Sequence, residues 1–167
     1  METELINRVA NSQLITINLE DFLSNLPVVV FDIKDQLYMG LMLKEGDFRS
    51  FLKAHDWQQY ADKAVTITCT TDAIVPTWAY MLVATYLSPV AKFIYFGTEA
   101  DLEQQMLKHN LDTLDIEQYR DQKVVIKGCF NKSVPVWAYV ELTKRLTGVA
   151  QKIMYGEPCS TVPLYKR

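Results

Sequence analysis

The sequence predicts a single α/β domain with a mixed, mostly parallel sheet, and three observations lead to this fold class. The chain has 167 residues, which lies within the usual size of one domain. Hydrophobic residues make up 49% and charged residues 22%, a balance typical of a globular protein with a full core. Strand-type and helix-type segments alternate along the chain, which favours parallel strands joined by crossover helices. We therefore expect one domain over residues 1–167.

The alternation is clearest in an internal repeat. A shift of 59 residues aligns residues 56–97 with residues 115–156 without a gap, and 16 of the 42 aligned positions are identical. Both segments contain the string VPxWAY, at residues 75–80 and 134–139. We interpret the two segments as tandem copies of one structural unit. Such a repeat indicates architecture and does not by itself indicate activity.

Each copy is expected to form a βαβ unit. A β-branched run is followed by a polar loop, by a helix that begins at a proline, and by a second apolar run. Strand, helix and strand within about 30 residues favour parallel strands with a right-handed crossover. The expected elements are strands 65–69 and 93–96 around a helix from Pro76 to about Pro89, and strands 124–128 and 152–155 around a helix from Pro135 to about Gly148. Asp72, Asn131 and Ser133 precede these helices and are of the capping or turn type.

The segments before and between the copies complete the fold. Residues 28–33 and 37–43 flank Lys34 and Asp35 and are expected to form an antiparallel β-hairpin. Asp32, Lys34 and Asp35 could pair as acid and base, but a solvated hairpin turn explains them adequately. Helices are expected over residues 47–55 and 99–108, and the amino-terminal twenty residues are expected to hold a short helix and an extended segment over 14–17. The sequence thus predicts two tandem βαβ repeats preceded by a hairpin.

Charge and cysteine content limit the classes of function. The formal charge is −3 and the pI about 5.4, so the sequence lacks the basic footprint that nucleic acids or anionic membranes require. The longest apolar stretch, residues 75–87, is too short for a transmembrane helix. The three cysteines are an odd number and no secretion signal is visible at the amino terminus. We therefore expect a cytoplasmic protein with free thiols that binds neither nucleic acid nor membrane.

The two predicted helices differ on one face. In the second helix this face is charged and is expected to meet water, whereas in the first helix it is largely apolar. The residues compared are Glu141, Lys144 and Arg145 in the second helix and Leu82, Thr85 and Tyr86 in the first. The apolar face must be covered, either by the amino-terminal segment or by another subunit. The sequence therefore allows a homodimer or a protein partner that contacts Leu82 and Tyr86.

The candidate ligand site lies beyond the carboxyl ends of the strands, where open α/β sheets bind ligands. Three segments meet this rule, at residues 70–72, 129–132 and 157–161. The candidate ligand-binding residues in them are Asp72, Asn131, Lys132, Ser160 and Thr161. Capping or turn formation is the simpler explanation for Ser160 and Thr161.

Cys129 and Cys159 are the candidate catalytic residues. If the strands that end at Gly128 and Gly156 are neighbours, both thiols lie at one edge of the sheet. Cys129 also precedes a helix and has Lys127 and Lys132 nearby, and both features favour a thiolate with a lowered pKa. The alternative is that both are ordinary half-buried thiols without chemistry. Cys69 ends a strand and is expected to lie in the core.

No motif in the sequence identifies a metal or a cofactor. CxxC, HExxH, GxGxxG and GxxxxGK[ST] are all absent. His55 and His109 lie near predicted helix ends, where isolated histidines are usually solvated or helix-terminal. Two cysteines with Glu157 or Asp72 could hold iron or an iron–sulfur cluster, but no spacing requires it. The sequence therefore predicts no metal site, leaves the cofactor unknown and does not decide whether the protein is an enzyme.

Three strings resemble the bacterial domain-of-unknown-function family 2480: FDIKDQLYMGLMLKEGDFR, the two VPxWAY segments, and KIMYGEPCSTVPLYK. The resemblance covers nearly the whole chain, but the family supplies no catalytic residues. It implies a link to iron–sulfur cluster assembly, because similar proteins tend to be encoded near genes for that process. Two hypotheses follow: an accessory factor in iron–sulfur assembly or sulfur handling that uses a loop thiol, and a non-catalytic α/β binding or assembly protein that acts through an apolar helix face.

Overall fold

The computed structural model describes residues 14–127 and 131–167, and these divide between two compact units. Unit 1 comprises Met1–Leu23 and Leu107–Arg167, and unit 2 comprises Ser24–Met106. The chain therefore begins in unit 1, forms all of unit 2, and returns to complete unit 1. The expectation that the whole chain behaves as one domain stays a prediction.

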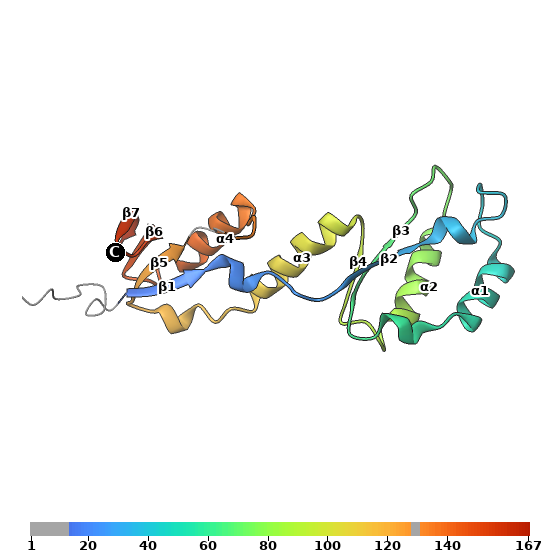
Figure 1. Cartoon of the computed structure of the whole chain (residues 1–167), viewed down its shortest axis with the longest axis horizontal. Coiled ribbons are helices and arrows are strands. Elements are labelled where there is room, and N and C mark those ends of the chain that lie inside the picture. The colour runs from blue at the N-terminus through green and yellow to red at the C-terminus, as the bar shows by residue number, and fades with distance from the viewer. Residues whose placement is uncertain (1–13, 128–130) are drawn as a thin grey trace, which may run out of the picture. The chain divides into compact units, whose positions relative to one another are not determined.

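Unit 2 is built on a three-stranded parallel sheet with the strand order β2-β3-β4 (Figure 1). Its strands are β2 (Val28–Asp32), β3 (Ala64–Thr68) and β4 (Phe93–Phe96), and its helices are α1 (Glu45–Ala54), α2 (Thr77–Leu87) and the short 3-10 turns η2 (Ile33–Gln36) and η3 (Trp57–Tyr60). Helix α2 lies between β3 and β4 along the chain, as expected for a parallel pair.

Residues of β3 alternate between two hydrophobic clusters, because successive side chains of a strand point to opposite faces. Val65 and Ile67 belong to the main cluster, which also contains the buried side chains Phe48 and Leu52 of α1 and Ala79, Val83 and Leu87 of α2. Ala64 belongs to a smaller cluster with Leu102 and Met106 of α3 (Glu99–Asp112). Both faces of the unit 2 sheet are therefore covered by helices.

Unit 1 is built on a four-stranded sheet with the order β1-β5-β6-β7. Strands β1 (Leu14–Asn18), β5 (Lys123–Lys127) and β6 (Lys152–Glu157) are parallel, and β7 (Ser160–Lys166) is antiparallel to β6. Helix α4 (Val136–Leu146) lies between β5 and β6 along the chain. The 3-10 turn η1 (Leu19–Phe22) follows β1, and the 3-10 turn η4 (Glu117–Tyr119) precedes β5. The central strand β5 thus pairs with a strand from the amino-terminal end of the chain.

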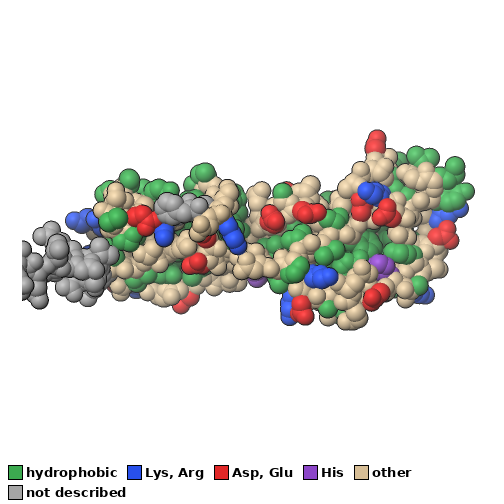
Figure 2. Space-filling model, in the orientation of Figure 1, with side chains coloured by type: hydrophobic (Ala, Val, Ile, Leu, Met, Phe, Trp, Pro, Cys, Tyr) green, Lys and Arg blue, Asp and Glu red, His purple; other side chains and the backbone are tan. Residues whose placement is uncertain are grey.

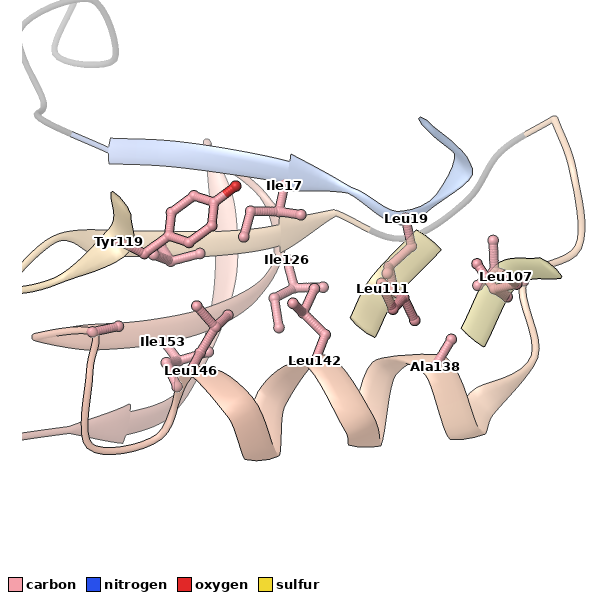
Figure 3. Close-up of a cluster of buried hydrophobic side chains, with 13 residues drawn as sticks. Ile17, Leu19, Leu107, Leu111, Tyr119, Ile126, Ala138, Leu142, Leu146 and Ile153 are labelled. Carbon is pink, nitrogen blue, oxygen red and sulfur yellow. The ribbon is translucent and has the colours of Figure 1, made fainter. Parts of the chain in front are cut away.

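Figure 3 shows the core of unit 1, in which one face of α4 packs against the sheet. Ala138, Leu142 and Leu146 are fully buried and repeat at helical spacing, so α4 presents one apolar stripe. The side chains that meet this stripe include Ile17, Ile126 and Ile153 from the sheet and Leu107 and Leu111 from α3. The boundary between the units falls within α3, after Met106.

The predicted fold class is confirmed as α/β with mainly parallel strands, but two details of it are wrong. The strands form two sheets rather than one. The expected hairpin over residues 28–33 and 37–43 is absent, since β2 pairs in parallel with β3 and residues 37–43 make only the isolated bridges Tyr38–Met42 and Met42–Ile74. The chain leaves β2 because the Asp32 side chain accepts the Lys34 amide and caps a 3-10 turn, whose first residue, Ile33, is fully buried.

Two further expectations about local structure are corrected. Residues 157–161 are not a free tail segment, because Ser160 and Thr161 open strand β7. The side chains of Asp72, Asn131 and Ser133 do not cap α2 and α4, whose N-cap residues are Pro76 and Pro135 without a side-chain bond. Among the described residues, no helix has the length and apolar character needed to cross a bilayer.

Candidate functional site

The carboxyl edge of the unit 2 sheet is held by Asp32, the last residue of β2. Its carboxylate accepts hydrogen bonds from the Thr70 hydroxyl at 2.5 Å, the Thr70 amide at 3.2 Å and the Lys34 amide at 3.0 Å. Burial works to raise the pKa of Asp32, but the bonds from Thr70 and Lys34 outweigh it, and the pKa lies below its ordinary value of 3.8. Asp32 is therefore an ionised clasp that fixes the loop after β3, and the expectation of a solvated turn is wrong for this residue.

Cys69 lies beside this clasp and is half-buried. Its thiol donates to the Thr71 carbonyl, with a sulfur to oxygen distance of 3.7 Å. The pKa of the Tyr80 hydroxyl, on α2, lies above its ordinary value of 10.0, first because of burial and then because of the nearby charges of Cys69 and Asp32. The Tyr80 ring meets Phe96, the last residue of β4, edge to face at 5.0 Å. The expectation that Cys69 lies in the core is therefore only partly met, because its thiol bonds to the edge loop.

The carboxyl edge of the unit 1 sheet has a different clasp. The Glu20 carboxylate, in the turn after β1, accepts the backbone amides of Asn131 at 2.9 Å and Lys132 at 3.2 Å. At the ends of β5 and β6, the Lys127 ammonium lies 3.8 Å from the Glu157 carboxylate, too far for a hydrogen bond but close enough for attraction. The chain's own carboxylate thus occupies the amides that an anionic ligand would use.

The predicted ligand-binding residues are divided between the two units. Asp72 belongs to unit 2, and Asn131, Lys132, Ser160 and Thr161 belong to unit 1. Asp72, Asn131 and Lys132 are exposed loop residues, and Ser160 and Thr161 pair with Glu157 and Gly156 in the β6–β7 ladder. The carboxyl-edge rule therefore located the loops correctly, and the role of these side chains in ligand binding stays a prediction.

The predicted thiol pair is described only in part. Cys129 lies outside the described residues. Cys159 is exposed and occupies the two-residue turn between β6 and β7. Strands β5 and β6 are neighbours, as the prediction required, and their last residues Lys127 and Glu157 each come two residues before a cysteine.

No three His, Cys, Asp or Glu side chains form a possible metal centre in the described ranges 14–127 and 131–167. His55 makes protein contacts instead. Its Nε2 lies 3.0 Å from the Tyr60 hydroxyl, and its ring is surrounded by Phe31, Phe51 and Trp57 at centroid distances of 4.8 to 5.7 Å. His55 is thus helix-terminal, as expected, since it is the C-cap residue of α1, but it is half-buried among aromatic rings and not solvated.

The apolar face of α2 is used within unit 2. Leu82 and Tyr86 are half-buried and pack against the main cluster, and the Tyr86 ring stacks on Trp57 at 5.0 Å. The core therefore accounts for much of this face. A partner that contacts Leu82 and Tyr86 stays a prediction.

Several large exposed apolar side chains of unit 2 lie away from this face, in a surface that sequence reasoning missed. Five of them gather at a tight turn after η2 and at the neighbouring loop, joined by the bridge between Met42 and Ile74. We name this surface the turn patch, and it consists of Tyr38, Met39, Leu41, Met42 and Ile74. Hydrophobic side chains cover the surface over this turn in Figure 2. The unbroken apolar run around Gly40 is the signal that could have indicated it, because a half-buried strand would show polar residues in alternation.

A family model for proteins of unknown function, DUF2480, matches residues 3–167. None of the curated proteins compared with the chain matches it, and none of the solved structures does. The resemblance seen in the three sequence strings is therefore confirmed over almost the whole length. This chain belongs to the DUF2480 family, whose members have no assigned function.

Proposed function

We propose that this protein is a non-catalytic docking or assembly protein that binds another protein through the turn patch of unit 2. The observation that carries the proposal is the exposure of Tyr38, Met39, Leu41, Met42 and Ile74 together at one turn. Contiguous exposed apolar surfaces of this kind usually mark interaction sites. Methionines suit such a surface because their side chains adapt to the shape of a partner.

The polar groups at the sheet edges favour binding over catalysis. Asp32 accepts three hydrogen bonds, and Glu20 accepts two backbone amides. Both carboxylates stabilise loops through these bonds. An acid or base catalyst needs a proton to exchange with substrate, and a lowered pKa such as that of Asp32 does not suit this task near neutral pH.

A photo-crosslinking residue in place of Met39 tests the proposal in the cells that make the protein. We expect a covalent adduct with a protein at Met39, and none at Val136 of α4, which has the same exposed fraction of 76% but lies outside the patch. Equal yields of adduct at the two positions, or none at Met39, would contradict the proposal.

A second candidate function is the thiol-dependent role in iron–sulfur assembly or sulfur handling, with Cys129 and Cys159 as the reacting residues. The neighbouring ends of β5 and β6 and the exposure of Cys159 support it. Alkylation rates measured against pH on protein purified without oxygen test it, with Cys69, which is bonded to Thr71, as the internal comparison. The candidate requires that Cys129 or Cys159 is alkylated faster than Cys69 at neutral pH, because the thiolate is the reacting form. Alkylation at both positions that is no faster than at Cys69 would remove the candidate.

We also propose that the two units are copies of one βαβ repeat. Residues 59 apart support this in detail. Asp62 and Asp121 both have positive φ, at 59° and 60°, and their amides donate to the carbonyls of Val90 and Val149. Aspartate tolerates this conformation better than most residues, which gives a physical reason for the identity. The first strand of each unit also pairs in the same register. The last residue of β1, Asn18, pairs with Lys127, and the last residue of β2, Asp32, pairs with Thr68, which lies 59 residues before Lys127.

A further inference from the structure

The turn patch has the size of a protein interface. Its five side chains are exposed by 47% at Tyr38, 76% at Met39, 64% at Leu41, 55% at Met42 and 87% at Ile74. At roughly 200 Å² for a large side chain, these fractions correspond to about 660 Å² of surface. Two such surfaces in full contact would bury about 1,300 Å², which is near the lower end of specific protein interfaces.

The turn that carries the patch is fixed by its backbone. Met39 and Gly40 both have positive φ, at 51° and 70°, and the Tyr38 amide donates to the Met42 carbonyl at 2.7 Å. The Lys44 ammonium lies 3.2 Å from the centre of the Tyr38 ring and adds a cation–π contact. The apolar side chains are therefore held outward before any partner arrives, which lowers the entropic cost of binding.

The charges beside the patch are of both signs. The exposed acids are Asp35, Glu45, Asp47 and Asp72, and the exposed bases are Lys34, Lys44 and Arg49. An anionic membrane or a partner of one charge sign would favour a rim of the opposite sign. A twofold interface instead brings a surface against its own copy, so a rim with both signs can pair with itself.

The turn patch has no counterpart in the described part of unit 1. There the turn after β1 ends at Phe22, and the chain passes to β2 at Val28 without a segment equivalent to residues 37–44. A surface that packs against its own copy closes with two copies. The expected assembly is therefore a closed dimer and not a filament.

We infer that the turn patch is the interface of a homodimer, in which it packs against the same patch of a second copy. This inference rests on the proposed docking function and names its partner. Met39 and Ile74 are the most exposed members and are expected to contribute most to association.

Sedimentation equilibrium of the purified full chain, from about 1 to about 200 µM, tests the inference. The wild type is expected to reach twice the 19.2 kDa chain mass at the upper concentrations. Met39→Gly removes a patch side chain at a position where glycine relieves a positive φ, so this variant should fold at least as well as the wild type. Met39→Gly and Ile74→Asp are each expected to weaken association at least about tenfold. Val136→Asp, an equally exposed change on α4, is the matched control and should associate like the wild type.

The outcomes separate this inference from the proposed function. A wild type that stays monomeric throughout, or a dimer that Met39→Gly and Ile74→Asp leave unchanged, would overturn the homodimer. An adduct at Met39 with a protein of different sequence, together with a monomeric wild type, would remove the homodimer and leave the docking function standing. A monomeric wild type together with no adduct at Met39 would remove both the homodimer and the docking function.

Discussion

The parallel strands of units 1 and 2 have the same order and register. The carboxyl-terminal ends of the matching helices, α4 and α2, are nevertheless held by different interactions. In unit 2, Tyr86 of α2 stacks on Trp57 within an aromatic group. In unit 1, the residue 59 positions later is Arg145 of α4, whose guanidinium donates to the carbonyls of Leu111, Asp112 and Leu114. The comparison teaches that one backbone position can be held by buried ring surface or by charge-assisted hydrogen bonds.

The structure also changes the interpretation of the charged face of α4. Glu141, Lys144 and Arg145 were all expected to meet water. Lys144 is exposed and forms an ion pair with Glu141 at 2.5 Å, whereas Glu141 and Arg145 are half-buried, and Arg145 covers the carbonyls at the end of α3. Carbonyl groups at a helix end lack intrahelical partners, and a nearby arginine satisfies them. The difference between α2 and α4 is therefore explained within each unit.

The two units differ again after the third strand. Unit 2 continues from Gly97 into α3, while unit 1 continues from Gly156 through the turn into β7. Gly156 has φ of 117°, and a Cβ there would lie 2.7 Å from the Ser160 carbonyl oxygen, so only glycine permits this hairpin. Unit 1 thereby gains an antiparallel edge strand where unit 2 gains a helix.

Matched cavities in the two cores are expected to have the largest effect. Leu87 and Leu146 lie 59 residues apart and are both fully buried. Leu87→Ala and Leu146→Ala should each cost about 2 to 5 kcal/mol, from lost burial and the cavity left behind. We expect hydrogen exchange to accelerate mainly in β3 and α2 for the first variant and mainly in β5 and α4 for the second. Equal acceleration in both units would show that the chain unfolds as the one domain that its length predicts.

Removal of the guanidinium of Arg145 should have the next largest effect. Arg145→Met keeps much of the side-chain volume but removes the guanidinium donor from the Asp112 and Leu114 carbonyls and one of the two donors of the Leu111 carbonyl, and should lower the free energy of unfolding by about 2 kcal/mol. Lys144→Met is the neighbouring control, and should change it by less than about 0.5 kcal/mol because that ion pair is at the surface. Urea titration measures both. Equal losses would mean that the bonds of Arg145 add nothing to stability.

Sequence reasoning predicted the helices and the central strands well, because proline and β-branched runs are local signals. Helices α2 and α4 begin one residue after Pro76 and Pro135, where they were expected. Strand pairing was harder, because the partner of β1 is distant: Leu14 pairs with Lys123. Strand β7 was missed because Pro163 argues against a strand interior, although an edge strand tolerates proline.

The candidate site could be predicted only to the level of its loops. The carboxyl-edge rule indicated residues 70–72 and 157–161 correctly as the ends of strands. The rule could not show that Asp32 binds the loop after β3 or that Glu20 binds the loop after β5. Each carboxylate is far in the sequence from the residues that it binds. The turn patch was read as a strand, because apolar residues around Gly40 suit a hairpin and only the tertiary structure shows that they stay exposed.

The two loop clasps give a smaller and paired effect. Glu20→Ala should release the amides of Asn131 and Lys132, and Asp32→Ala should release the amide of Thr70, each at a cost of about 1 kcal/mol. Amide exchange rates measured by NMR should rise at these residues in the matching variant and not in the other. Asp21→Ala, which changes the exposed acid next to Glu20, is the control. Unchanged exchange at Asn131 and Lys132 in Glu20→Ala would contradict the clasp.

The smallest expected effect is a pH dependence that only unit 2 carries. Burial lowers the pKa of His55 below its ordinary value of 6.5, and the nearby charge of Asp56 opposes this only in part. The unfolded chain therefore binds the proton more readily than the folded chain, so stability should be fully present above about 6.5 and should fall as the pH drops toward the folded pKa. Unit 1 has Leu114 at the matching position. His55→Leu should remove this part of the slope in urea midpoints between about pH 7.5 and 5.5, while His109→Gln should retain it. If the slope survives His55→Leu unchanged, the aromatic group around His55 does not distinguish the two units in their response to acid.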